Sequence, residues 1–274
     1  MIRGLYTAGA GMIAQQRRQE MLTNNLANVN TPGYKADQAS LRTFPNYFIK
    51  ALGTDHMPKY GTNRMGDMAT GVYMQERTPD FQQGDINETR NNTDVALLQG
   101  LVPMDEETGQ AGLLAYAVQN DEGEVRYTRN GNFIIDGEGF LTTSHGYYIL
   151  GTDGEPLNVE SENFTVRNNG DILVGDEELI GQFDVMLIPD PGQLVKEGNG
   201  LLRYDGENAI ASAVGNDEVA YQMQQGFIER SNVDPASAMT EMMSTLRSFE
   251  ANQQVLRAYD SSLEIAVNQI GRIG

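Results

Sequence analysis

The feature that most constrains the fold is a narrow apolar stripe near the C-terminus of the 274-residue chain. Its members follow one another in alternating steps of three and four over nearly five heptads, which is coiled-coil spacing. Asp234 and Pro235 predict where this helix begins, as an N-cap and a proline at the first helical position. The stripe consists of Met239, Met242, Leu246, Phe249, Gln253, Leu256, Asp260, Leu263, Val267 and Ile270.

A helix over residues 235–271 would be about 55 Å long at 1.5 Å per residue, which is more than a compact domain of this size needs. A stripe sustained over several heptads normally packs on a partner helix, here the N-terminal helix or helices of neighbouring molecules. The alternative is a helix that docks on the core of its own domain, as most amphipathic helices do. The length and narrowness of the stripe favour a partner helix.

A shorter stripe of the same spacing begins the chain, and for it docking on its own domain is an equally good interpretation. The run ends in four asparagines, which Thr31-Pro32-Gly33 follows, and these residues predict that the helix stops near residues 28–30. The members of this stripe are Leu5, Ala8, Met12, Gln15, Gln19, Leu22, Leu26 and Val29.

Between the two helices, glycine and aspartate punctuate short runs of β-branched and aromatic residues. Asn130-Gly131, Asp136-Gly137 and similar pairs predict tight hairpins, because both central residues of a type I′ turn need positive φ. We expect an antiparallel β domain over residues 71–230 and an irregular connector over 31–70. The predicted fold is therefore a mainly β central domain, with N-terminal (1–30) and C-terminal (231–274) helices forming a coiled-coil domain.

Composition excludes several chemistries. The chain has no cysteine and two histidines, so disulfides, thiolate nucleophiles and zinc–thiolate sites are absent. Its net charge of −19 is uneven, because residues 51–230 carry −21 and residues 1–50 carry +4. An acidic middle repels nucleic acid. We expect neither membrane insertion nor a cleaved signal peptide.

The short motifs do not assemble an active site. Gly9–Ala14 matches a dinucleotide fingerprint, but no strand precedes it, so close helix packing explains its small residues better. The acidic runs 105–107 and 176–178 lie among turn residues, and His56 and His145 are expected on the surface. We predict no catalytic residue, cofactor, small-molecule substrate or metal site, with fortuitous calcium at an Asp-Gly turn left open.

Several blocks of the sequence resemble bacterial flagellar axial proteins, the family of rod, hook and hook-junction subunits. Residues 3–35 resemble the N-terminal signature of that family, 127–133 its YTR-x-G-x-F hairpin, and 225–234 its entry to the last helix. The length and the one β domain are most similar to the distal-rod type. The signature residues are Asn24, Asn25, Asn28, Asn30, Gly33, Tyr34, Tyr127, Arg129, Gly131, Ser231, Asn232 and Val233.

The resemblance implies a self-assembling structural subunit of the flagellar rod, which is both drive shaft and wall of an export channel. It implies a place in the basal body, export without a cleaved signal peptide, and as partners copies of the chain, neighbouring rod and hook subunits and the flagellar export apparatus. We expect the self-assembly seam to comprise Leu5, Met12, Leu22, Leu26, Val29, Met242, Leu246, Phe249, Leu256, Leu263, Val267 and Ile270.

Three alternatives stay open at this point. Within the family, the chain could be a hook or hook-junction subunit. Outside it, a β-domain hydrolase acting on cell-wall glycan could use acidic pairs, since glycosidase carboxylates can lie far apart in sequence. A secreted β module or adhesin that does not polymerise is the third.

Overall fold

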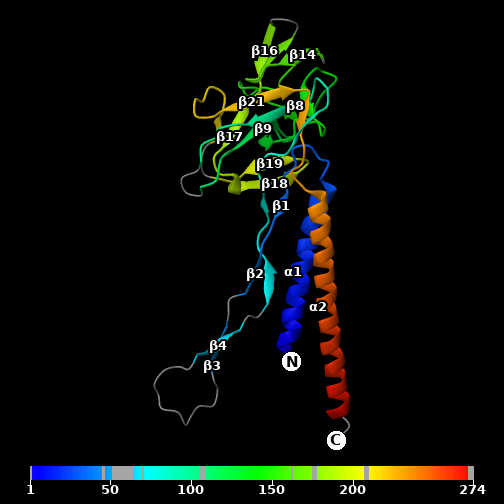
Figure 1. Ribbon diagram of the computed structural model, residues 1–274. Helices are drawn as coiled ribbons and strands as arrows, with labels where there is room; N and C mark the ends of the chain where they lie inside the picture. Colours follow the sequence, from blue (N-terminus) through cyan, green and yellow to red (C-terminus); the bar gives the residue numbers. More distant parts are fainter. Residues whose placement is uncertain are drawn as a thin grey trace. The chain divides into compact units, whose positions relative to one another are not determined.

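The computed structural model describes residues 2–44, 47–50, 64–68, 71–104, 109–161, 163–174, 178–206 and 210–270. The chain divides into two compact units, whose elements are labelled in Figure 1. The helical unit comprises Met1–Ala27, Asp37–Thr78 and Asp234–Gly274, and the β unit comprises Asn28–Ala36 and Pro79–Val233. Both units are therefore built from segments that are separated in the sequence.

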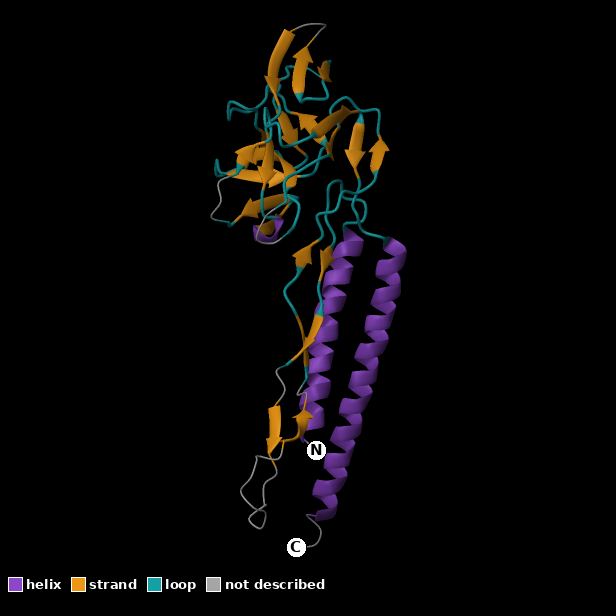
Figure 2. Cartoon of the chain, turned by 60° about the vertical axis from the view of Figure 1, so that its left-hand side comes forward, coloured by secondary structure: helices purple, strands orange, loops and turns teal. Residues whose placement is uncertain are grey.

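The helical unit contains two long helices, α1 (Ile2–Ala27) and α2 (Pro235–Ile270), which lie side by side (Figure 2). Both predicted helices are present, and their ends fall within three residues of the predicted ones. The carboxylate of Asp234 accepts a hydrogen bond from the amide of Ala236 at 2.9 Å, as expected of an N-cap. Among the helices described, neither combines the length and the apolar character that crossing a membrane requires.

The prediction of an irregular connector over residues 31–70 is wrong in part, because short strands lie there. β2 (Leu41–Thr43) pairs with β5 (Val72–Met74), and β3 (Tyr47–Lys50) pairs with β4 (Arg64–Met68). β1 (Asp37–Gln38) pairs with β6 (Thr78–Pro79). Pairing between distant segments gives no local period, so the sequence pattern missed these strands.

A nine-stranded sheet forms the centre of the β unit, in the order β11-β12-β13-β9-β10-β19-β18, and β17 also pairs with β9 and with β20. Neighbouring strands are antiparallel, as predicted. The strands are β9 (Leu113–Gln119), β10 (Val125–Thr128), β11 (Phe133–Ile135), β12 (Leu141–Thr143), β13 (Tyr148–Ile149), β17 (Val185–Ile188), β18 (Leu194–Gly198), β19 (Leu201–Tyr204) and β20 (Ala211–Ser212).

Smaller sheets complete the β unit. β14 (Phe164–Val166), β15 (Asp171–Val174) and β16 (Glu178–Gln182) form a three-stranded sheet. β8 (Val95–Gln99) pairs with β21 (Tyr221–Gln225), and β7 (Ile86–Glu88) pairs with β22 (Phe227–Glu229). A 3₁₀ turn, η1 (Pro191–Gln193), precedes β18.

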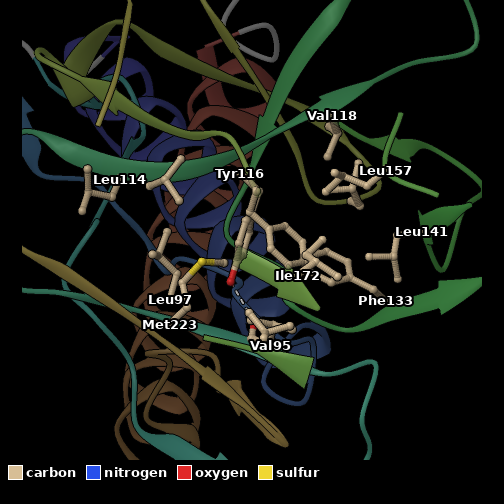
Figure 3. Packing of buried hydrophobic residues seen from close by; sticks show 14 of the residues in the cluster. Val95, Leu97, Leu114, Tyr116, Val118, Phe133, Leu141, Leu157, Ile172 and Met223 are labelled. Atoms are coloured by element: carbon tan, nitrogen blue, oxygen red, sulfur yellow. Dashed lines mark hydrogen bonds between the residues drawn. The ribbon is translucent and has the colours of Figure 1, made fainter. Parts of the chain in front are cut away.

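The main core of the β unit is centred on Tyr116, a fully buried residue of β9 (Figure 3). Its ring packs edge-on against Phe133 with centroids 5.2 Å apart, and Phe183 lies 5.9 Å from both rings. Its hydroxyl donates to the carbonyl of Val95 at 2.8 Å, so the buried polar atom is satisfied. Burial raises the pKa of the Tyr116 hydroxyl far above its usual range.

The hairpin predicted at Asn130-Gly131 is wrong, and those at Asp136-Gly137 and Asn169-Gly170 are confirmed. β11 and β12 pair across the Asp136-Gly137 turn, and β14 and β15 pair across Asn169-Gly170. At Asn130-Gly131, by contrast, β10 pairs with β9 and β19, and β11 pairs with β12, so the flanking strands do not pair with each other. The amide of Val95 donates to the carbonyl of Gly131 at 2.9 Å, which ties this segment to β8 instead.

Candidate assembly site

The inner face of α2 contains half of the predicted C-terminal stripe. Met242, Phe249, Leu256 and Leu263 are partly covered. The positions that alternate with them are mostly small or polar. Asn252 and Tyr259 among them lie against α1. A side chain at Gly11 of α1 would meet the carboxamide of Asn252. These alternating positions, each partly covered or buried, are Ala238, Thr245, Asn252, Tyr259 and Ala266.

The other half of the stripe faces away from α1. Met239, Leu246 and Val267 are 51%, 42% and 68% exposed, and each lies one residue beyond a buried or half-buried position. For Met239 and Leu246, which lie beside α1, the small and polar residues at the contact let the helices approach and leave the larger side chains outside it. The side chain of Ile270 lies outside the described residues.

The predicted N-terminal stripe does not divide in this way, because its members are all buried or half-buried. Leu22 is buried, and Leu5, Met12 and Leu26 are half-buried, while Val29 follows the end of α1 and belongs to the β unit. The Gly9–Ala14 motif lies inside α1, without a preceding strand, and its Gly11 and Ala14 are buried. The motif therefore serves helix packing, as the sequence indicated. Arg18 joins α1 to α2 through Glu241, with 3.0 Å between Nη2 and Oε2.

A buried ionic cluster brings three blocks of the family resemblance together within the β unit. Lys35 Nζ lies 2.6 Å from Glu229 Oε1, and Arg129 Nη2 lies 2.5 Å from Glu229 Oε2. All three side chains are at most 3% exposed. Arg129 also donates to the carbonyls of Leu97 and Leu114, both at 2.8 Å. We call Lys35, Arg129 and Glu229 the ionic cluster.

The pKa values in the cluster follow from its geometry. Burial lowers the pKa of Lys35, against the raising effect of the Glu229 charge. Burial alone would raise the pKa of Glu229, but the charges of Arg129 and Lys35, together with hydrogen bonds, hold it below its ordinary value. Each charge is therefore stable only while its partners are present. Of the three, the predicted signature residues included only Arg129.

The signature residues beside the cluster form hydrogen bonds with the backbone or allow it to approach closely. The side chain of Asn232 accepts from the amide of Ala36 at 2.7 Å and donates to the carbonyl of Asp80 at 2.8 Å. Gly33 has φ of +68°, and a side chain there would strike the backbone of Arg129. A side chain on Gly131 would likewise strike the carbonyl of Val95.

The remaining signature residues lie around these contacts. In the helical unit, Asn25 is buried and exchanges two 2.9 Å hydrogen bonds with the backbone of Asp37. In the β unit, Lys196 Nζ lies 4.4 Å from the ring centre of Tyr34. Asn24 and Asn30 are exposed, Asn28, Tyr127 and Ser231 are half-buried, and Val233 is buried.

The residues weighed for chemistry show no common site in the described part of the chain. His145 is exposed, with Nδ1 3.3 Å from the hydroxyl of Ser144, and it stacks on Tyr147. His56 and the acidic residues 105–107, 176 and 177 lie outside the described residues. Within the described ranges, histidine, aspartate and glutamate do not gather in groups of three that could hold a metal ion.

Three family models match the chain in order. They are the flagella basal body rod protein over residues 5–35, the flagellar hook protein FlgE/F/G D1 domain over 115–174, and the flagellar basal body rod FlgEFG protein C-terminal over 224–270. The chain is 45% identical over 273 residues to the flagellar hook-basal body complex protein FlhO of Bacillus subtilis, with 100% of both chains covered. It is 28% identical to the flagellar basal-body rod protein FlgG of Borreliella burgdorferi, with 98% of each chain covered, and 27% identical to that of Bacillus subtilis.

Proposed function

The chain belongs to the family of flagellar basal-body rod and hook proteins, and on that premise we propose how it is built into the rod. It is a structural subunit of the flagellar rod in the basal body. In our proposal, copies join one another and neighbouring rod and hook subunits through their terminal helices, which associate as coiled coils. Cell-wall hydrolysis and non-polymerising adhesion are not carried further, because the family is one of structural proteins.

The observation that carries the proposal is the outer half of the α2 stripe. Met239, Leu246 and Val267 expose large apolar side chains at heptad spacing along a helix whose inner half already faces α1. The two heptad positions between Leu246 and Val267 are Gln253 and Asp260, so the apolar side chains form two exposed groups, and we take each as a contact for a protein partner. A helix that contacts α1 on one side and a neighbouring subunit on the other gives a heterologous interface, which a helical filament requires because it does not close into a ring.

Two further roles complete the proposal. A rod that transmits torque needs rigid subunits, and the ionic cluster with its backbone hydrogen bonds ties distant segments of the β unit together. A chain without cysteine can also leave the cell unfolded through the flagellar export apparatus without forming disulfides on the way. FlgG is named as a rod protein, so we retain the rod over the hook.

The test compares the two halves of the stripe. Leu246→Asp and Val267→Asp place charges on the outer flank, so the purified monomer should keep its helix content while incorporation into basal bodies is lost. Leu256→Asp puts a charge on the half-buried flank beside α1, so it should reduce the helix content of the monomer itself. Gln254→Asp, at an exposed polar position of α2, is the control and should incorporate normally.

Circular dichroism of the monomers and immunoblots of purified basal bodies give the two readouts. Normal incorporation of the Leu246→Asp, Val267→Asp double variant would overturn the proposal. Loss of helix content in that double variant would also contradict it, because the outer flank would then belong to the monomer's own packing.

A further inference from the structure

A row of side chains crosses five strands on one face of the nine-stranded sheet. Direct cross-strand pairs connect Ile134 to Thr142, Thr142 to Tyr148, Tyr148 to Gln119 and Gln119 to Val125. Residues that pair directly in an antiparallel sheet point to the same face, so all five share one side. We call them the cross-strand row, and at about 4.8 Å per strand it is about 19 Å long.

The row lies on the face opposite the main core. The sequence neighbours of its members, Phe133, Leu141, Val118 and Ile149, point the other way and belong to that core, where Figure 3 labels Phe133, Leu141 and Val118. On the row's own face, Ile134 and Val125 are 50% and 46% exposed at its two ends. Half-buried Tyr148 and Gln119 and buried Thr142 lie between these two ends, so the face combines two exposed apolar side chains with a partly covered middle.

Aromatic rings fill the middle of the row. Tyr148 is half-buried and meets the half-buried ring of Phe140 edge to face, with centroids 5.7 Å apart. Thr142 is buried between them, with its hydroxyl donating to the carbonyl of Ile134 at 3.3 Å. Aromatic residues that are held by their neighbours can contribute contact area with little loss of conformational freedom on binding.

The turns that border the row are acidic. The β9–β10 turn contains Asp121, Glu122 and Glu124, and the β11–β12 turn contains Asp136 and Glu138. Neither 119–125 nor 134–142 contains a lysine or an arginine. A rim of a single sign selects a partner of the opposite sign and repels one of the same sign.

Arg126 neutralises one acid of this rim, Glu124. It pairs with Val118, a core-face residue of β9, and its side chain binds Glu197 and Glu124 with contacts of 2.5 Å each. Its charge is therefore already matched by two carboxylates. The face that carries the row remains acidic at both bordering turns.

We propose that the cross-strand row binds a protein surface with an apolar centre and a rim of lysine and arginine. A second copy of this chain docking row on row would place acidic turns against acidic turns, so the partner is a different protein. This surface lies wholly in the β unit and is separate from the helical stripe proposed for self-assembly.

Photocrosslinking of the full chain in flagellated cells tests the proposal. A benzoylphenylalanine replaces Ile134 in one variant and Leu179 of β16, which is 59% exposed outside the row, in the control. We expect an adduct from position 134 only, with a different protein whose crosslinked segment carries more lysine and arginine than acid. Exchanging Glu122 and Glu138 for lysine should lower its yield by about tenfold, because complementary charges become like charges.

The charge-matched control exchanges Asp153 and Glu155, exposed acids outside the bordering turns, for lysine and should leave the adduct unchanged. Crosslinks are scored in whole cells and swimming is scored separately, so a failure of rod assembly is distinguishable from a failure of this surface. The proposal is overturned by an adduct with another copy of the chain, with a glycan or with an acidic segment. Equal yields from positions 134 and 179, or no adduct, would overturn it as well.

Discussion

Arg129 and Glu229 stand one hundred residues apart in the sequence, and in the interior of the β unit Arg129 Nη2 donates to Glu229 Oε2 over 2.5 Å. Lys35 holds the other carboxylate oxygen at 2.6 Å, and the amide of Gly84 donates to that same oxygen at 2.9 Å. One carboxylate thus fixes the β-unit segment that follows α1, the segment after β10 and the end of β22.

Removing one member of the cluster should be costly. Arg129→Met leaves the Glu229 carboxylate buried with one cationic partner fewer and removes one donor from each of two carbonyls, so we expect a loss of about 3–5 kcal/mol in the free energy of unfolding. Urea unfolding of the full chain measures it. Arg203→Met, which removes surface ion pairs with Asp205 and Glu197, should leave the midpoint of urea unfolding nearly unchanged. Equal effects from the two variants would contradict the structural role of the cluster.

The cluster also predicts a pH dependence. The pKa of Glu229 is held below its ordinary value of 4.5, so between the two values the unfolded chain binds a proton that the folded chain does not. Its contribution to stability is therefore complete above pH 4.5 and is lost as the pH falls through the lowered pKa. The stability difference between the wild type and Glu229→Gln should narrow below pH 4.5. A difference that stays constant from pH 7 to pH 3 would show that this carboxylate does not titrate as described.

The close approach at Gly131 gives a prediction about packing. A methyl group there would strike the carbonyl of Val95, so Gly131→Ala should destabilise the β unit by about 1–3 kcal/mol. Gly137, in the β11–β12 turn, is open to solvent on its Cβ side, which makes Gly137→Ala the matched control. Thermal unfolding of both variants checks the expectation. A Gly131→Ala protein as stable as the control would mean that the backbone at Gly131 moves away from Val95 without loss of stability.

A fragment of residues 28–233 should fold as a monomer without the terminal helices. It keeps the ionic cluster and the side chain of Asn232, which binds the backbone of Ala36 and Asp80. A shorter fragment, 31–231, lacks Asn232 and should unfold at lower temperature, since buried backbone groups lose their partners. Circular dichroism and light scattering on both fragments decide this. An unfolded 28–233 fragment would refute the independence of the β unit.

Periodicity and caps located both helices, because a helix is a local structure whose signals lie within its own residues. The side of α2 that faces α1 was harder to predict from the sequence. Hydrophobicity alone selected Met239 and Leu246, whereas the inner face uses Ala238, Thr245 and Asn252. A contact made by small and polar residues depends on how the surfaces of two helices fit together. The sequence of one helix is therefore not enough to predict it.

The ionic cluster shows the same limit in the β unit. Lys35 and Glu229 lie in blocks that resemble the flagellar family. The only sequence signal for each is a charged residue close to a predicted turn or strand. Glu229 pairs with Arg129 across 100 residues and with Lys35 across 194, and no local pattern carries such contacts. The Asn130-Gly131 hairpin failed for the related reason that its flanking strands find partners elsewhere in the sheet.

The most direct test of the central claim is to locate the chain in purified basal bodies. A compact tag inserted at Gly154, in an exposed turn of the β unit, can be imaged by electron microscopy in cells that swim on the tagged protein. We expect tag density on the rod, at a constant axial position in every particle. Tag density on the hook alone, or basal bodies that are complete without the chain, would contradict it.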